Sequence, residues 1–106
     1  MRIDFIAKLK YFETENGGRE TPAISGYRPQ LKFSFSNMQT SGQQIFIDKE
    51  TVYPGDEVHA KITMLSPRFY LGRLNDGTNF EFGEGLGIIG TGEITEIINE
   101  ELREAK

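Results

Sequence analysis

A glycine-rich run near the C-terminus comes closest to a known chemical motif. Gly85, Gly87 and Gly90 match the G-x-G-x-x-G pattern, which holds a pyrophosphate when it lies between a strand and the N-terminus of a helix. Residues 91–95, which follow, alternate as in a strand, and no βαβ unit surrounds the motif. We therefore interpret these glycines as part of a hairpin and predict that the chain holds no cofactor.

Histidine and carboxylate side chains, the usual general acids, bases and metal ligands, are too widely spread for catalysis. His59, the single histidine, lies at an outward position of a predicted strand without a neighbouring partner, which is typical of a solvated side chain. The acidic residues that could form pairs are Glu13, Glu15, Asp56, Glu57, Glu81, Glu84, Glu100 and Glu101. Cysteine is absent, which excludes disulfides, thiolate metal sites and cysteine nucleophiles. The sequence predicts a protein that is not an enzyme and binds no metal.

The densest unusual segment covers residues 17–30. It combines glycine and proline turn formers with Arg19, Tyr27, Arg28 and Gln30. Two interpretations are open from the chemistry alone. The arginines can bond backbone carbonyls of a structured loop, or the segment can form a rigid polar platform for a partner, because Tyr and Arg concentrate binding energy at interfaces.

Strand-type alternation dominates the rest of the chain. In residues 3–11 the apolar face consists of Ile3, Phe5, Ala7, Leu9 and Tyr11. In residues 30–36, Leu31, Phe33 and Phe35 alternate with polar residues and are expected in the core. The remaining strand segments are residues 45–47, 58–65, 80–82 and 92–98. Short strands separated by turn signals predict a small antiparallel sandwich or barrel.

Glycine and proline mark the predicted turns. Pro54 and Gly55 have the spacing of the central residues of a type II turn, in which Gly55 takes a positive φ. The sequence Asn75-Asp76-Gly77 predicts a second turn. Residues 37–43 are polar, and we expect a loop there with Gly42 as its turning point.

Length and composition limit the remaining classes of protein. The chain has 106 residues, of which 37% are hydrophobic, enough for one modest core. Its 12 basic and 16 acidic side chains give a net charge of −4. That balance argues against a free-standing nucleic-acid binder, because such affinity comes mainly from Lys and Arg at phosphates. No apolar run reaches the length of a signal peptide or a membrane span. We expect one soluble cytoplasmic domain that does not bind a membrane.

The segment 17–30 also resembles the start of domain III of elongation factor Tu. The resembling pattern is Gly17-Gly18-Arg19-x-Thr21-Pro22-x-x-x-Gly26-Tyr27-Arg28-Pro29-Gln30. Shorter matches follow in the same order: Tyr53-Pro54-Gly55-Asp56, Pro67, Gly77 with Phe80, Glu84-Gly85, and Gly90-Thr91-Gly92. The resemblance covers residues 3–98 and implies an all-β fold, a six-stranded antiparallel Greek-key β-barrel. We place this barrel at residues 1–98 and a polar C-terminal tail, with a frayed helical turn, at residues 99–106.

The resemblance implies a barrel without the GTP-dependent domains of that factor. In the family, domain III packs against the other domains, contacts the backbone of the aminoacyl-tRNA acceptor and T stem, and meets the nucleotide-exchange factor. The positions that match the family's tRNA-side residues are Arg19, Gln30, Glu84 and Gly85. The sequence departs from the family where Ser34, Ser66 and Gly87 replace basic or histidine residues. The loops at residues 37–42 and 67–77 are longer than the family's.

Three classes of function are therefore compared. The first is a non-catalytic module connected with translation that binds a protein: a translation factor, a toxin that targets such a factor, or a second copy of itself. The alternative is residual binding to the backbone of the aminoacyl-tRNA acceptor and T stem. The candidate residues for either partner are Arg19, Tyr27, Arg28, Gln30, Glu84 and Gly85. A hydrolase with two facing carboxylates is the third class, and the spacing of the acidic residues does not favour it.

Overall fold

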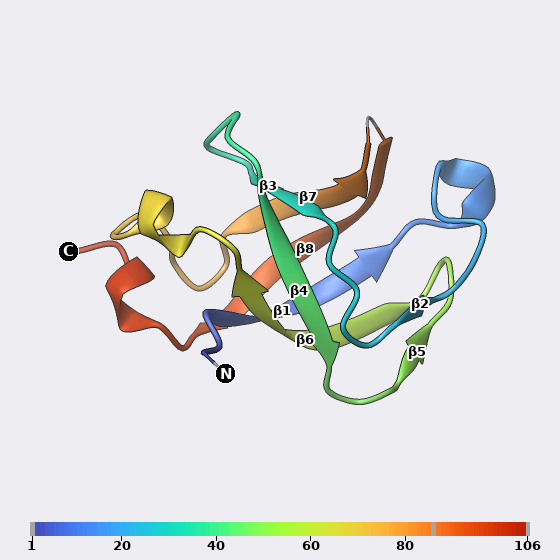
Figure 1. The fold of residues 1–106 in the computed structure, drawn as a ribbon, viewed down its shortest axis with the longest axis horizontal. Coiled ribbons are helices and arrows are strands. Elements are labelled where there is room, and N and C mark those ends of the chain that lie inside the picture. The colour runs from blue at the N-terminus through green and yellow to red at the C-terminus, as the bar shows by residue number, and fades with distance from the viewer. Residues whose placement is uncertain (1, 86, 106) are drawn as a thin grey trace.

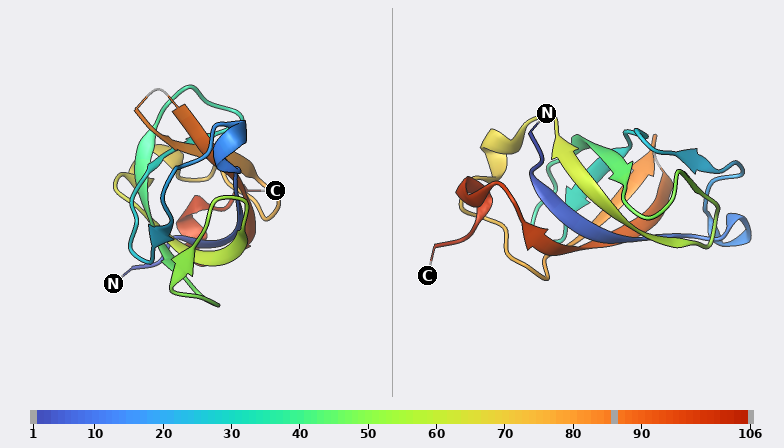
Figure 2. Two further views of the ribbon diagram at one scale, coloured as in Figure 1. Left: turned by 90° about the vertical axis from the view of Figure 1, so that its right-hand side faces the viewer. Right: turned by 90° about the horizontal axis from the view of Figure 1, so that it is seen from below.

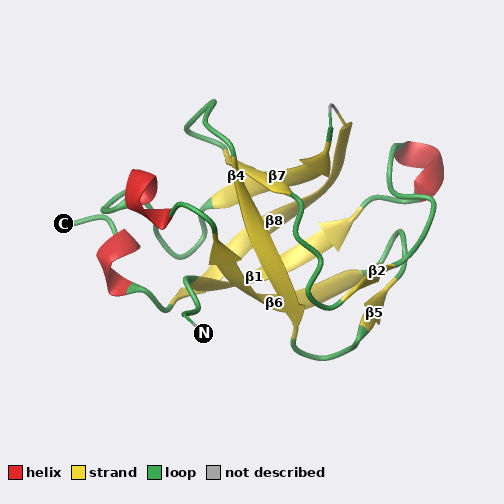
Figure 3. Ribbon diagram, viewed as in Figure 1, coloured by secondary structure: helices red, strands yellow, loops and turns green. Residues whose placement is uncertain are grey.

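A computed structural model describes residues 2–85 and 87–105, and these residues form a closed antiparallel β-barrel (Figure 1). The barrel strands are β1 (Phe5–Tyr11), β3 (Gln30–Phe33), β4 (Thr40–Phe46), β6 (Glu57–Met64), β7 (Asn79–Glu84) and β8 (Gly87–Ile97). A separate two-stranded sheet consists of β2 (Ala23–Ile24) and β5 (Thr51–Val52). The described residues contain no α-helix, only the 3₁₀ turns η1 (Thr14–Asn16), η2 (Pro67–Tyr70) and η3 (Glu100–Leu102), drawn as helices in Figure 3.

The order of the strands around the barrel is β1-β6-β4-β3-β7-β8, and β8 pairs again with β1. Among the barrel strands, β3, β4 and β6 follow one another along the chain and are also neighbours in the barrel. β1 precedes all three in the chain but pairs with β6, the last of them. This order is that of a Greek key. Seen along the long axis in the left view of Figure 2, the strands enclose one interior. The structure confirms the predicted six-stranded antiparallel Greek-key barrel.

Period-two alternation places one apolar face of each long strand inside the barrel. The predicted inward residues of β1, from Phe5 to Tyr11, are at most 1% exposed, and their outward neighbours Lys8 and Lys10 face solvent. Strand β6 repeats the pattern with buried Val58, Ala60, Ile62 and Met64. This burial removes the apolar face from water, which is the main term that favours folding.

Aromatic rings fill the interior, and Phe33 lies at their centre. Its ring centroid lies 5.8 Å from that of Phe80, 6.2 Å from that of Phe5 and 5.0 Å from that of Tyr70. The Phe80 ring also reaches Gly92 of the neighbouring strand, where an ideal Cβ would lie 2.2 Å from Phe80 Cζ. Glycine is therefore required in β8 because a side chain there would overlap a core ring.

Two predicted turns are confirmed, and each has a glycine with a positive φ. Gly55 has φ 93°, and the amide of Asp56 donates to the carbonyl of Tyr53 at 3.0 Å. Gly77 has φ 91°, and the amide of Thr78 donates to the carbonyl of Asn75 at 3.1 Å.

The prediction that Gly42 turns a polar loop is wrong. Gly42 is an extended residue of β4, which begins at Thr40, and it pairs with Met64 of β6. An ideal Cβ on Gly42 would lie 3.1 Å from Cδ1 of Leu31, so the glycine makes room for a core side chain. The loop between β3 and β4 is accordingly shorter than expected.

Two strand ends also differ from the predictions. β3 ends at Phe33, and Phe35 lies in the following turn, where it is 42% exposed and stacks on Phe33 at 5.7 Å. β8 begins at Gly87 rather than Gly92, since its early residues pair with β7. The small sheet of β2 and β5 was not predicted, because strands of this length carry no periodic signal.

The two ends of the chain are tied together at one end of the barrel. The fully buried carboxylate of Asp4 accepts from the amide of Met64 at 2.7 Å and from the side chain of Asn99 at 3.1 Å. Its outer partner is Arg2, whose Nε lies 3.1 Å from Asp4 Oδ1. The helical turn expected within residues 99–106 is η3, and its Leu102 is fully buried. The division of the chain at residue 98 stays a prediction.

Replacing Gly55 by valine should destabilise the protein by about 1–3 kcal/mol, because a β-branched residue is strained at positive φ. An ideal Cβ there would also lie only 3.1 Å from Cγ of Glu13. The free energy of unfolding from urea denaturation measures the loss. The matched control is Gly87→Val, where φ is not positive and the nearest atom to a Cβ is 3.7 Å away. Equal stability of both variants would contradict the assigned turn.

Phe33→Ala should cost about 3–5 kcal/mol, because it leaves a cavity among the core rings. Phe35→Ala is the control, since it removes a ring of the same size that is 42% exposed. Its expected cost is about 0.5–1.5 kcal/mol, the value of an aromatic pair. Urea denaturation of the two variants tests the assignment, and a cost for Phe35→Ala as large as that for Phe33→Ala would refute it.

Candidate functional site

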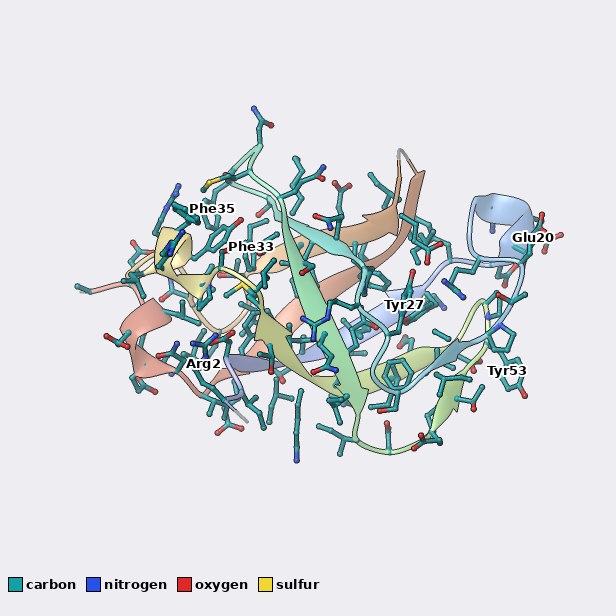
Figure 4. The ribbon with its side chains drawn as sticks, viewed as in Figure 1. Arg2, Glu20, Tyr27, Phe33, Phe35 and Tyr53 are labelled. Atoms are coloured by element: carbon teal, nitrogen blue, oxygen red, sulfur yellow. The ribbon has the colours of Figure 1, made fainter. Side chains whose placement is uncertain are left out.

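The residues predicted to meet a partner come from separate segments that converge at one end of the barrel. Arg19 lies in the loop after β1, Tyr27 lies between β2 and β3, and Glu84 ends β7. Figure 4 places Tyr27 and Glu20 in the half of the molecule that also holds the small β2–β5 sheet. The opposite half holds η2, η3 and Arg2.

The side chains of Arg19, Tyr27 and Glu84 form one cluster, which we name the Arg19–Tyr27–Glu84 cluster. The guanidinium carbon of Arg19 lies 4.6 Å from the centroid of the Tyr27 ring. One arm of the guanidinium bonds Oε2 of Glu84 at 2.5 Å, and the Tyr27 hydroxyl donates to the same oxygen. Arg19 also donates through Nε to the carbonyl of Thr21 at 3.1 Å. Each side chain is thus held by the other two.

Glycines determine the course of the loop that carries Arg19. Gly17 has φ 95°, in the left-handed region that favours glycine. The amide of Gly18 donates to the carbonyl of Glu13 at 2.9 Å, and an ideal Cβ on Gly18 would lie only 2.0 Å from the carbonyl oxygen of Phe12. The Gly-Gly pair therefore folds the chain back on itself immediately before Arg19.

Backbone bonds to β4 fix the position of Tyr27. The carbonyl of Tyr27 accepts from the amide of Gln44 at 2.8 Å, and the amide of Gly26 donates to the carbonyl of Gln44 at 2.7 Å. Beneath Tyr27, the hydroxyl of buried Tyr11 donates to the side chain of Gln44. Tyr27 is therefore anchored to β4 through the backbone, and its side chain packs against the buried core.

Burial is the main cause that raises the pKa of Tyr27, and the hydrogen bond to Glu84 raises it further. Burial likewise raises the pKa of Tyr11, with Tyr27 as the next cause. Both hydroxyls stay protonated near neutral pH and can donate. The Arg19 side chain is 18% exposed and that of Glu84 is 50% exposed, so the carboxylate is the more accessible member of the ion pair.

Gln30 and Gly85 lie beside the cluster in a shallow hollow of about 160 Å³. Gln30 pairs with Gly83 across β3 and β7, which brings it near Gly85, the residue that follows β7. Lys32 and Gln39 also line this hollow. Sequence reasoning missed both. Lys32 could have been found from its outward position in the same strand as Gln30.

Arg28 is not part of the cluster. It is exposed, and among residues 2–85 and 87–105 its side chain has neither a hydrogen bond nor an ion pair. The structure therefore brings Arg19, Tyr27 and Glu84 into direct contact, places Gln30 and Gly85 alongside, and leaves Arg28 free on the surface.

The glycine-rich run near the C-terminus is part of the barrel wall. Gly87 pairs with Glu84 in the hairpin between β7 and β8, and an ideal Cβ on Gly90 would lie 2.3 Å from Cζ of Phe82. A strand follows the run instead of a helix, which favours the hairpin interpretation over a pyrophosphate site. Across the described part of the chain, no group of His, Cys, Asp and Glu is arranged to hold a metal ion, and no helix could span a membrane.

Stability should fall as the pH rises above about 10, where an unfolded tyrosine loses its proton. The raised pKa of Tyr27 means that the folded state keeps this proton, so alkaline pH favours the unfolded state. In Tyr27→Phe, the free energy of unfolding should fall less steeply with pH. Urea denaturation at several pH values between pH 9 and pH 11, a range of about one unit on either side of the ordinary tyrosine pKa, measures this slope. Tyr53→Phe, which removes an exposed hydroxyl, is the control. Equal slopes for wild type and Tyr27→Phe would contradict the assignment.

The comparison with known protein families agrees with the fold and with the pattern of residues 17–30. A family model described as the elongation factor Tu C-terminal domain matches residues 2–98. The match covers all the barrel strands and the Arg19–Tyr27–Glu84 cluster. This chain belongs to the elongation factor Tu C-terminal domain family.

Proposed function

We propose that this protein is a non-catalytic binding module that acts in translation, and that it binds a protein partner through the Arg19–Tyr27–Glu84 cluster. The family is that of a translation-factor domain, which supports a role in translation. The observation that carries the proposal is the mutual bonding of three side chains from distant segments into one partly exposed surface.

A cluster held in this way suits recognition because little side-chain freedom is lost when a partner binds. Tyr and Arg are also the residue types most often found at the energetic centres of interfaces. The half-exposed carboxylate of Glu84 can accept a further hydrogen bond from a partner. The neighbouring hollow at Gln30 and Gly85 extends the surface that a partner would cover.

A non-catalytic role is supported by the state of the cluster's own groups. The carboxylate oxygen of Glu84 that faces the cluster already accepts from both Arg19 and Tyr27. The pKa of the Tyr27 phenol is raised, so its neutral form donates and does not act as a base near neutral pH.

The second candidate function is binding to the backbone of the aminoacyl-tRNA acceptor and T stem. It is favoured by exposed Arg28 and by Lys32, which lies in the hollow beside Gln30 and Gly85. It is opposed by the pairing of Arg19 with Glu84, because a neutralised arginine releases fewer counterions from a phosphate. Protein binding is therefore the first proposal.

Immobilised wild-type protein should retain a specific protein from cell lysates at a stoichiometric level. Arg19→Gln should weaken this retention at least about tenfold, the effect of losing about 1.4 kcal/mol at an interface centre. Arg28→Gln, which changes an arginine outside the cluster, is the matched control. Thermal melting of each variant checks that it is folded.

A tRNA titration at low and moderate salt separates the two candidates. Saturable binding that weakens with salt and with Arg28→Gln, without a retained protein, would replace the first proposal by the second. Absence of a retained protein across several lysates, together with no saturable tRNA binding, would refute both.

A further inference from the structure

The end of the barrel opposite the Arg19–Tyr27–Glu84 cluster exposes apolar side chains. The turn after β3 and the segment between β6 and β7 meet there, and Figure 4 places Phe35 beside η2. Phe35, Phe69 and Leu71 are 42%, 49% and 48% exposed. We name these residues, together with Arg68 and Arg73, the loop-end patch.

Core contacts hold the two segments of the loop-end patch together. The ring of Phe35 stacks on buried Phe33, whose ring meets that of buried Tyr70 in η2 at 5.0 Å. The amide of Arg73 donates to the carbonyl of Tyr70 at 3.1 Å. The exposed ring of Phe35 is therefore attached to the aromatic core, and η2, which carries Phe69, is joined to the same core through Tyr70.

Each arginine of the patch stacks on one of the exposed rings. The guanidinium carbon of Arg68 lies 4.9 Å from the centroid of Phe69, and that of Arg73 lies 4.7 Å from the centroid of Phe35. Within residues 2–85 and 87–105, neither side chain has a carboxylate partner or a hydrogen bond. A guanidinium stacked by its face leaves its N–H edge free for a planar anion.

Of the other four arginines, three are already paired with carboxylates, and Arg28 is exposed and unpaired but stacks on no ring among the described residues. Arg2 lies 3.1 Å from Asp4, Arg19 bonds Glu84, and Arg103 lies 2.8 Å from Glu100. These carboxylates satisfy the charge within the fold. Arg68 and Arg73 thus differ from them in offering unsatisfied donors next to apolar surface.

Two hollows flank the patch. One of about 500 Å³ is lined by Phe35, Arg73 and Glu104, and another of about 450 Å³ is lined by Arg68, Leu71 and Glu101. Both place an arginine beside an apolar side chain. A ligand that reaches the two unpaired arginines would therefore place single acidic groups there, next to apolar groups, and keep them away from Glu101 and Glu104.

The charge of the surroundings favours a protein over a nucleic acid as this ligand. The chain carries a net charge of −4, and Glu101 and Glu104 line the two hollows. A nucleic acid would bring many phosphates toward these carboxylates, whereas an acidic peptide can place single carboxylates at the two arginines. Leu71 also offers aliphatic surface, which suits an apolar side chain better than a stacked base.

We propose that the loop-end patch docks an acidic segment of a partner protein, with carboxylates at Arg68 and Arg73 and apolar side chains on Phe35, Phe69 and Leu71. The carboxylates would bind the free guanidinium edges in the bidentate manner. This site is separate from the Arg19–Tyr27–Glu84 cluster, so it does not depend on the function proposed for that cluster.

Selection from a random twelve-residue peptide library displayed on phage, a length chosen as roughly that of an interface segment, tests the proposal without a known partner. The enriched peptides should combine Asp or Glu with Leu, Phe or Trp. Their affinity for the Arg68→Gln/Arg73→Gln double variant should fall at least about tenfold. Arg28→Gln is the control, because it removes an arginine that has no carboxylate partner but lies outside the patch. The enriched peptides should bind the Arg28→Gln variant with the same affinity as they bind the wild-type protein.

Thermal melting checks that the double variant is folded, which is expected because both arginines are on the surface. Selection that enriches no peptide, or peptides that the double variant binds equally well, would overturn the proposal. An oligouridylate that binds the patch more tightly than the enriched peptides would also overturn it and assign the surface to nucleic acid.

Discussion

Closure of the barrel between β7, β8 and β1 is the constraint on which the rest of the structure depends. The rings of Phe80 and Phe82 lie across Gly92 and Gly90 of β8, where any Cβ would overlap them. Because these glycines lack side chains, β8 can pair with both neighbours while the rings fill the interior. Closure leaves no barrel strand with an unpaired edge and directs the connecting loops to the two ends.

Each end of the barrel uses its arginines differently. At one end Arg19 is bonded to Glu84 and stacked on Tyr27, which makes a rigid surface whose charge is balanced internally. At the other end Arg68 and Arg73 stack on exposed rings without a carboxylate partner among the described residues. The first surface therefore suits recognition by shape and directed hydrogen bonds. The second suits recognition by charge next to apolar contact.

Prediction succeeded where one face of a strand is fully apolar and failed where it is not. β6 alternates strictly, and β1 does so except at Ile6, so their inward residues were predicted correctly. The inward positions of β4 are Thr40, Gly42, Gln44 and Phe46. Only the last of these is strongly apolar, which hid the strand and made Gly42 look like a turn. Phe35 was misplaced because alternation alone does not indicate where a strand stops pairing.

The sequence by itself determined the all-β class, the glycine turns at Gly55 and Gly77, and the family pattern of residues 17–30. These features depend on local backbone preference and on period-two burial, which neighbouring residues specify. Only the tertiary structure decided that Glu84 meets Arg19 and Tyr27, from which it is separated by 65 and 57 positions. Such contacts depend on the register between distant strands and on loop packing, and these are set when the whole barrel closes.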